Sequence, residues 1–159
     1  MQSERVNSVV DHGCFGCGEK NPIGLRLAFY RHGEAGVRGT FTPAREHEGY
    51  LGMTHGGILS TVLDEAMSWA VLADGRLAVT MRMEVRFRRP VPVEQPVEVV
   101  AEVVRDRGRV VETRGEIRDG EGTVLVSATG AFIRVSDEQQ AEWEAVYFRT
   151  ERPQNRPDS

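Results

Sequence analysis

The sequence predicts a single α+β domain in which a long antiparallel sheet packs against one buried helix. Residues 56–73 are the one strong stretch in which apolar side chains recur at helical spacing, and residues 79–88 alternate strictly between apolar and polar side chains. Further strand-like segments separated by turns follow, which favours an antiparallel sheet. A chain of 159 residues is long enough to form one domain with its own core.

The elements expected before the helix are short. Residues 1–24 are rich in glycine and hold both cysteines of the chain, so we expect an irregular segment. Short strands are predicted over residues 25–30 and 37–42, joined by a glycine-bearing turn at residues 33–36. Residues 43–54 combine proline, glycine and mixed charges without a period, which indicates a loop.

The predicted helix and the strand after it have opposite patterns. The helix over residues 56–73 is apolar on all sides, which is typical of a helix buried in a core. Asp74-Gly75 ends it, because glycine suits the left-handed conformation found after helices. The strand over residues 79–88 has one apolar and one polar face, since successive side chains of a strand point to opposite sides. The polar set is Thr80, Arg82, Glu84, Arg86 and Arg88.

The remainder of the chain is expected to complete the sheet and add a short helix. Three more strands are predicted over residues 97–105, 109–118 and 122–135, with hairpin turns at 106–108 and 119–122. Ser136 is a good helix N-cap, and acidic residues follow it. We therefore divide the chain into an N-terminal Cys/Gly-rich segment (1–24), a main domain (25–135), a short C-terminal helix (136–148) and a disordered tail (149–159).

Composition argues against several classes of protein. The net charge of −4 weighs against a general nucleic-acid binder, which is expected to be basic. No apolar stretch approaches the 18 residues of a membrane span, and the first residues lack the pattern of a secretory signal. We therefore expect a cytoplasmic protein without nucleic-acid or membrane partners.

Three sequence segments carry a resemblance to a known family. The segments CFGCGEKNPIGLRL, THGGILSTVLDEAMSWA and VTMRMEVRFRRPVP together resemble the PaaI-type hotdog acyl-CoA thioesterases, over about residues 13–135. The resemblance implies the hotdog fold, in which a long antiparallel sheet wraps around one buried central helix. It also implies hydrolysis of acyl-CoA thioesters to a free acid and CoA. The family works as a homodimer or a dimer of dimers, forms its active sites between subunits, and needs no cofactor and no metal.

The candidate catalytic residues lie on the helix and the following strand. A helix start offers unpaired N–H groups to a carbonyl oxygen that gains negative charge. The resemblance assigns this role to the N–H of Gly56, with His55 positioning the turn. Asp64 is a carboxylate in an otherwise apolar helix, which is costly and often marks a functional site. The resemblance makes it the nucleophile or the base, and implies that Thr80 is contributed by the other subunit and helps to hold the water.

Two further positions, Glu65 and Gly49, bear on the assignment of the catalytic residues. Glu65 competes with Asp64 for the catalytic role. Adjacent side chains on a helix point about 100° apart, so the two are not expected to face the same site. We expect Glu65 to be solvated or to contact a second subunit. Some relatives carry an amide side chain six residues before the histidine, where this chain has Gly49. Another group must supply any role that this amide has.

Arginines form a local excess of positive charge. Between residues 76 and 118 there are ten arginines and seven acidic residues, in a chain that is acidic as a whole. The phosphates of CoA suit such a surface. By resemblance, Arg86, Arg88 and Arg109 match positions that touch the CoA moiety of the substrate. The competing interpretation is that they pair with glutamates on neighbouring strands.

Cys14 and Cys17 leave three interpretations open. With His12 they resemble half of a zinc knuckle, but no second cysteine pair exists to complete four ligands. They could also form a redox pair or belong to a structural loop, and we favour the loop. Two other functions also stay open for the chain as a whole: a non-catalytic acyl-CoA binding module, and a hotdog acyl-CoA dehydratase or hydratase.

Overall fold

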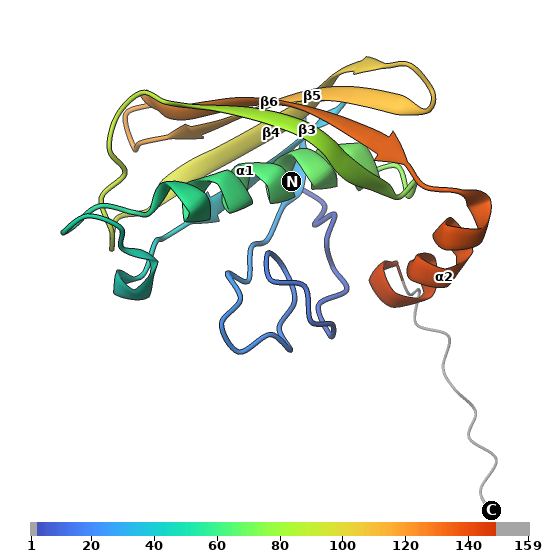
Figure 1. Ribbon diagram of the computed structural model, residues 1–159, viewed down its shortest axis with the longest axis horizontal. Coiled ribbons are helices and arrows are strands. Elements are labelled where there is room, and N and C mark those ends of the chain that lie inside the picture. Colours follow the sequence, from blue (N-terminus) through green and yellow to red (C-terminus); the bar gives the residue numbers. More distant parts are fainter. Residues whose placement is uncertain (1–2, 149–159) are drawn as a thin grey trace, which may run out of the picture.

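A computed structural model describes residues 3–148, and Figure 1 shows a curved sheet lying over one long helix. The helix α1 spans Gly56–Leu72, close to the predicted range. The sheet has six antiparallel strands in the order β1-β2-β4-β5-β6-β3. The strands are β1 (Tyr30–His32), β2 (Gly36–Phe41), β3 (Ala78–Phe87), β4 (Val97–Asp106), β5 (Val110–Arg118) and β6 (Val124–Arg134). The predicted α+β class and hotdog arrangement are confirmed.

The chain order explains why β3 lies at an edge. Strands β4, β5 and β6 follow one another through hairpins, and the turns contain Gly108 and Gly122 at φ 85° and 83°. These left-handed values suit glycine, which has no Cβ. The chain enters β3 directly from the helix and pairs it with β6 alone, so β3 has a free side within the described residues.

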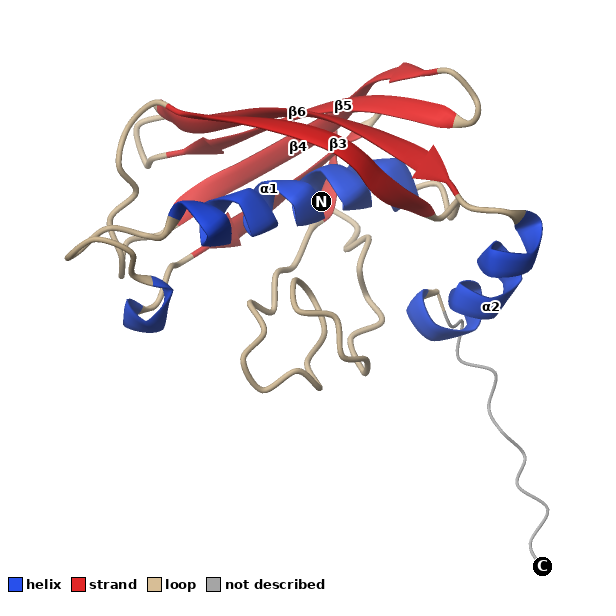
Figure 2. Cartoon of the chain, viewed as in Figure 1, coloured by secondary structure: helices blue, strands red, loops and turns tan. Residues whose placement is uncertain are grey.

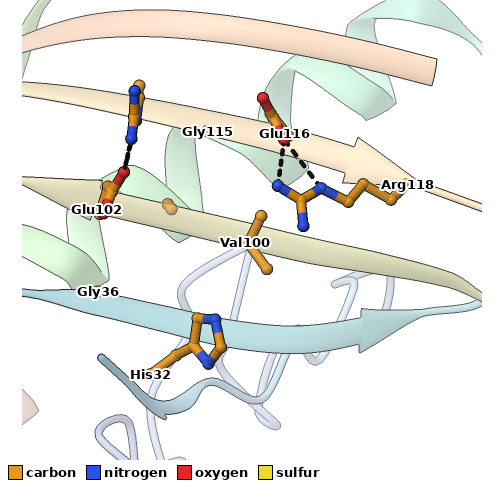
Figure 3. A pocket seen from close by; sticks show the side chains of 9 residues that line it. His32, Gly36, Val100, Glu102, Gly115, Glu116 and Arg118 are labelled. Atoms are coloured by element: carbon orange, nitrogen blue, oxygen red, sulfur yellow. Dashed lines mark hydrogen bonds and ion pairs between the residues drawn. The ribbon is translucent and has the colours of Figure 1, made fainter. Parts of the chain in front are cut away.

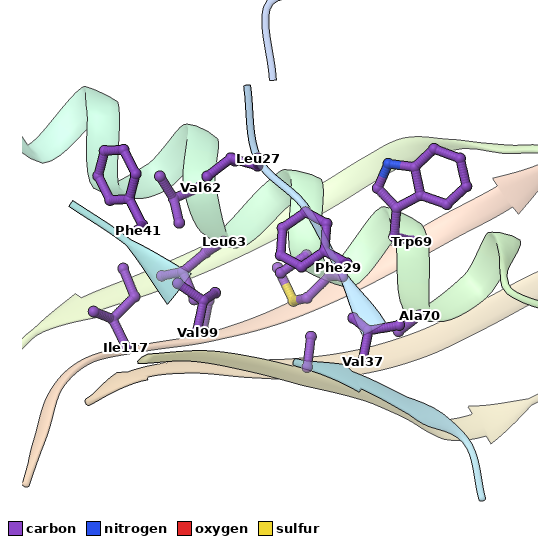
Figure 4. Close-up of a cluster of buried hydrophobic side chains, with 14 of the residues drawn as sticks. Leu27, Phe29, Val37, Phe41, Val62, Leu63, Trp69, Ala70, Val99 and Ile117 are labelled. Carbon is purple, nitrogen blue, oxygen red and sulfur yellow. The ribbon is translucent and has the colours of Figure 1, made fainter. Parts of the chain in front are cut away.

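The core fills the space between the helix and the concave face of the sheet (Figure 4). Val62, Leu63 and Met67 of α1 are fully buried against the strands. The helix packs closely on Gly115 of β5, where an added Cβ would lie 3.2 Å from a methyl carbon of Leu63. Burial of a large apolar side chain of this kind stabilises a fold by about 1.5–3 kcal/mol, so this layer is the main source of stability.

The prediction of a strand over residues 25–30 is wrong in its position. Leu27 and Phe29 are buried as their apolar character indicates, but the regular strand begins only at Tyr30. The side chain of Asn7 explains the difference, because it accepts a bond from the N–H of Phe29 and donates one to the carbonyl of Leu27. A polar side chain thus takes the place of a neighbouring strand.

Two further segments lie outside the layer formed by the sheet and α1. Figure 2 shows the N-terminal segment as a loop beneath α1, and the second long helix α2 (Asp137–Tyr147) beside the end of the sheet. Ser136 caps α2 through Gln139, as predicted. The tail over residues 149–159 lies outside the described residues, and the division into segments remains a prediction. Within the described part of the chain, no helix is long and apolar enough to cross a membrane.

Candidate active site

The start of α1 leaves one backbone N–H available to a ligand. His55 is the N-cap, and its Nδ1 accepts a 2.8 Å hydrogen bond from the N–H of Gly57. No acceptor among the described residues bonds to the N–H of Gly56. His55 therefore satisfies one of the first helical donors, and Gly56 keeps its donor at the positive end of the helix dipole.

Asp64 and Thr80 meet in the same chain. The hydroxyl of Thr80 donates a 2.6 Å hydrogen bond to Oδ1 of Asp64. Asp64 is partly buried, and Thr80 is exposed on the edge strand β3. The resemblance implies that Thr80 acts across a subunit boundary, but here it reaches the aspartate of its own chain.

A β-bulge brings Thr80 to Asp64. Thr80 is opposite Phe132 of β6, whereas Arg82 is opposite Ala131, so β3 has one extra residue between them. A bulge turns the side chains before it to the other face of the sheet. Thr80 thus shares the helix-facing side with buried Phe132.

The bulge corrects the predicted alternation. Thr80 and the arginines were expected on one face, but they lie on opposite faces of β3. Val79 and Met81 belong to the apolar set of this alternation, but they are 44% and 50% exposed. An inserted residue leaves the apolar–polar pattern of the sequence unchanged, so periodicity could not reveal it.

The helix start and Asp64 lie too far apart to act on one carbonyl group within a single chain. Eight residues separate Gly56 from Asp64, and a rise of 1.5 Å per residue makes this about 12 Å. Reacting groups need to lie about 3 Å from the atoms that they serve. The described chain therefore holds the two halves of the expected site but does not bring them together.

Glu65 was expected to be solvated or to contact a second subunit, but the structure covers its carboxylate with residues of its own chain. Its carboxylate accepts a 3.1 Å bond from the indole N–H of Trp69, and the N-terminal segment covers it: an added Cβ on Gly16 would lie 2.4 Å from it. Burial raises the pKa of Glu65 to about 7, with a further contribution from Cys14. Asp64 and Glu65 thus point to different surroundings, as their helical positions require.

Arg86 of β3 and Arg88, just after this strand, lie on the outer face of the sheet, away from α1. Arg86 pairs with Glu84 at 3.2 Å, and Arg88 donates to the hydroxyl of Ser127 at 3.2 Å. Both arginines line a shallow depression of about 260 Å³. A second depression of about 230 Å³ lies on the same face and is crossed by ion pairs such as Arg118–Glu116 (Figure 3).

Arg109 is not close to Arg86 and Arg88. It precedes β5, and its carbonyl accepts a bond from the N–H of Arg134 at the far end of β6. Arg86 is opposite Ser127, seven residues earlier on β6, which is about 23 Å away along the strand. The three arginines assigned to CoA therefore occupy two separate places on one chain.

Comparison with known proteins finds a family that part of the chain resembles. Residues 51–126, which include the helix start, Asp64 and Thr80, match the thioesterase superfamily. A thioesterase superfamily protein of known structure is 29% identical, with a TM-score of 0.69 over 73% of this chain and 60% of that chain. The chain is therefore similar to the thioesterase superfamily over the stretch that holds these candidate residues.

The curated relatives are longer proteins. Acyl-coenzyme A thioesterase THEM4 of Xenopus laevis is 31% identical over 109 residues, which are 67% of this chain and 49% of that protein. THEM4 of Mus musculus is 25% identical over 119 residues, or 74% of this chain and 51% of that protein. The chain thus spans about half the length of the curated relatives it matches.

More distant structures share the fold. The PaaI protein of Escherichia coli, from the phenylacetic acid degradation operon, is 20% identical, with a TM-score of 0.66 over 70% of this chain and 81% of that chain. A hypothetical thioesterase of Streptococcus pneumoniae, solved with coenzyme A, is 19% identical, with a TM-score of 0.65 over 69% and 89%. At these identities the likeness supports the hotdog fold.

Proposed function

We propose that this protein hydrolyses acyl-CoA thioesters, and that Asp64 and Thr80 activate the attacking water. The observation that carries the proposal is the 2.6 Å bond from Thr80 to Asp64 at an exposed edge of the domain. The threonine hydroxyl donates to one carboxylate oxygen, so its own lone pairs stay free to accept a bond from water. The second carboxylate oxygen is then available to take the proton from that water.

The reaction requires a base and an oxyanion donor around one carbonyl carbon. Water gives a proton to Asp64 as its oxygen forms a bond to the thioester carbon. The carbonyl oxygen becomes negative, and the N–H of Gly56 at a helix start stabilises this charge. The carbon–sulfur bond then breaks, CoA leaves as the thiolate, and the proton held by Asp64 returns to the leaving sulfur.

The site becomes complete when a second copy supplies the other half. Gly56 lies beside the end of β3, since an added Cβ would be 3.4 Å from the ring of Phe87. Asp64 lies beside the beginning of β3, at Thr80. Antiparallel pairing of the two β3 edges around a two-fold axis would set the beginning of one strand beside the end of the other. Each Asp64 would then face Gly56 of the partner subunit, which gives two equivalent sites.

The edge of β3 has the chemistry of an interface. Its backbone groups are unpaired on one side, and such an edge is a template for another strand. Val79, Met81 and Phe87 are 44%, 50% and 55% exposed on this strand. Tyr50 and Leu51, in the loop before α1, are exposed as well. An apolar edge of this kind favours a second copy of the chain.

The same pairing supplies a place for the phosphates of CoA. Arg86 and Arg88 lie toward the end of β3, and Arg109 lies at the end of the sheet where β3 begins. Edge-to-edge pairing would bring the first two toward Arg109 of the partner subunit, although Arg109 stands two strands, or about 10 Å, in from the edge. CoA bound at the junction would meet positive charge from both copies.

Two features of structural neighbours support the assignment. A hypothetical thioesterase of Streptococcus pneumoniae has been solved with an aspartate or with a threonine replaced by alanine, and these positions are sixteen residues apart. The same spacing separates Asp64 from Thr80. A protein of Streptococcus mutans with the same fold was solved bound to acetyl-CoA.

The test is release of free thiol from a panel of acyl-CoAs, short to long and aromatic. We expect hydrolysis by the wild type and a fall of at least about a hundredfold in Asp64→Asn, since a catalytic base is lost. Asp74→Asn makes the same chemical change at an exposed position on the helix end and should keep full activity. Absence of hydrolysis across the panel, with carrier-protein thioesters included, would favour an acyl-CoA binding module instead.

A further inference from the structure

A second cluster of reactive side chains lies on the face of α1 away from the sheet. Three ligand atoms lie within 4.8 Å of one another: the sulfur of Cys14, the sulfur of Cys17 and a carboxylate oxygen of Glu65. The Cys14 Sγ is 3.8 Å and 3.9 Å from the two oxygens of Glu65. None of these groups takes part in the proposed hydrolysis, so their convergence needs its own explanation.

The separations fit a tetrahedral metal ion. Zinc holds sulfur at about 2.3 Å and oxygen at about 2.0–2.2 Å, so tetrahedral geometry separates its ligand atoms by about 3.5–3.8 Å. The two Cys14–Glu65 distances are within a few tenths of an ångström of this range. Small side-chain rotations would close the cluster around one ion.

The cysteine loop is shaped to stabilise a thiolate. The Cys14 sulfur lies within reach of the Cys17 thiol and of the backbone N–H groups of Cys17 and Gly16. Gly16 and Gly18 let the loop close tightly, since an added Cβ on Gly18 would lie 2.2 Å from the carbonyl of His12. A CxxC loop with N–H groups aimed at its sulfur is suited to a metal thiolate.

His12 holds the cysteine loop from one side. It is 5% exposed, and its Nδ1 accepts a 3.3 Å bond from the N–H of Cys14. Its Nε2 lies 3.0 Å from the carbonyl oxygen of Val9. Both ring nitrogens therefore have partners, and His12 fixes the loop without joining the cluster of converging ligand atoms.

The cluster lacks a compensating positive charge. No arginine or lysine in the described part of the chain forms an ion pair with Glu65. The ring of Tyr147 packs on His12 with centroids 4.9 Å apart, and Trp69 closes another side. A divalent cation would offset the charge of the enclosed carboxylate and thiolates. A disulfide would use the two sulfurs and leave the carboxylate uncompensated.

We propose that Cys14, Cys17 and Glu65 bind one zinc ion, with the fourth tetrahedral position taken by solvent. The donor set favours zinc, because thiolate ligands select zinc over the harder cations. Binding displaces the thiol protons to solvent. The ion would join the N-terminal segment to α1 at the residue next to Asp64, so it would stabilise the helix that carries the site. The inference does not depend on the proposed reaction.

The test uses the full chain without an affinity tag, purified without chelators. We expect about one zinc per chain by elemental analysis. Replacement by Co²⁺ should give thiolate-to-metal charge-transfer bands and the strong visible bands of a tetrahedral site. Cys17→Ser and Glu65→Gln should each weaken Co²⁺ binding by more than about tenfold, because even groups behind the ligands contribute that much. Glu19→Gln, in the same loop but exposed, is the matched control.

The wild-type measurements decide the matter even if a variant fails to fold. Free Cys14 and Cys17 thiols with neither zinc nor a Co²⁺ spectrum after reconstitution would overturn the proposal. A Cys14–Cys17 disulfide found by mass spectrometry in protein purified in air, with no metal bound after reduction and reconstitution, would overturn it in favour of a redox pair. Thioester hydrolysis is measured separately, so failure of either proposal leaves the other standing.

Discussion

Thr80 donates its hydroxyl to Oδ1 of Asp64 at 2.6 Å, and a bulge in the intervening strand makes this contact possible. Without the extra residue between Thr80 and Arg82, Thr80 would share the outer face with the arginines. The bulge therefore separates one strand into a part that serves the helix and a part that carries positive charge outside. This division underlies the predictions below.

The Thr80–Asp64 contact predicts a specific loss in a threonine variant. Thr80→Val removes the hydroxyl at nearly constant shape, and we expect kcat for acyl-CoA hydrolysis to fall about 10- to 100-fold, because a bond to a charged group is lost. Thr80→Ser keeps the hydroxyl and should recover most of the activity. Equal loss in both variants would show that the methyl group, rather than the bond, is needed.

The helix start offers a way to delete one N–H without disturbing the fold. Gly56 is the first residue of α1, where proline is well tolerated, and His55 before it is extended at φ −60° and ψ 134°. Gly56→Pro should lower kcat about 10²- to 10³-fold, as loss of an oxyanion donor does, with little change in melting temperature. Gly56→Ala keeps the N–H, and its Cβ meets the ring of Phe87 at an ordinary 3.4 Å. Activity in the proline variant equal to that of the alanine variant would remove Gly56 from the mechanism.

The outer-face arginines predict an effect on substrate binding alone. Arg86→Ala combined with Arg88→Ala should raise KM for an acyl-CoA by about 5- to 10-fold at low salt and leave kcat unchanged, since both side chains are exposed and screened. The corresponding pantetheine thioester lacks the nucleotide phosphates, so its KM should not change. Arg38→Ala, on β2, is the matched control. A fall in kcat, or an equal effect on both substrates, would contradict the assignment.

The ion pair between Asp106 and Arg134 predicts a pH-dependent stability. Arg134 donates to both carboxylate oxygens, at 2.7 Å and 2.9 Å, and these bonds lower the pKa of Asp106 to about 2. A lowered carboxyl pKa stabilises the folded state above the unfolded pKa near 4, and this contribution disappears as pH falls toward 2. Asp106 is half exposed, so Asp106→Asn should cost less than about 1 kcal/mol at pH 7. Denaturant unfolding at pH 7 and pH 2 should show the difference between variant and wild type only at pH 7.

The sequence was informative wherever a regular pattern persisted. The helix, the long strand and the three later strands fall within one or two residues of their predicted ends, because apolar periodicity and turn glycines determine them. The first strand was misplaced since the side chain of Asn7, more than twenty residues away, replaces strand pairing at Phe29. Contacts of that range leave no local signal.

The candidate site was predictable only residue by residue. Asp64 stood out as a carboxylate in an apolar helix, and the structure joins it to Thr80. The expected solvation of Glu65 was wrong, because the loop that covers it comes from fifty residues earlier in the chain. The distance between Gly56 and Asp64 follows from helix geometry alone, but its consequence for a second copy emerges only when β3 is seen at the edge of the sheet.

The central claim is that Asp64 of one chain acts with Gly56 of another. Mixing two inactive variants, Asp64→Asn and Gly56→Pro, after unfolding and refolding them together tests it directly. Half of the randomly paired dimers would be mixed, and each mixed dimer would hold one intact site, so we expect about a quarter of wild-type activity. If Asp64 and Gly56 act within one chain, every site in the mixture carries a lesion, and activity would stay at the level of the separate variants.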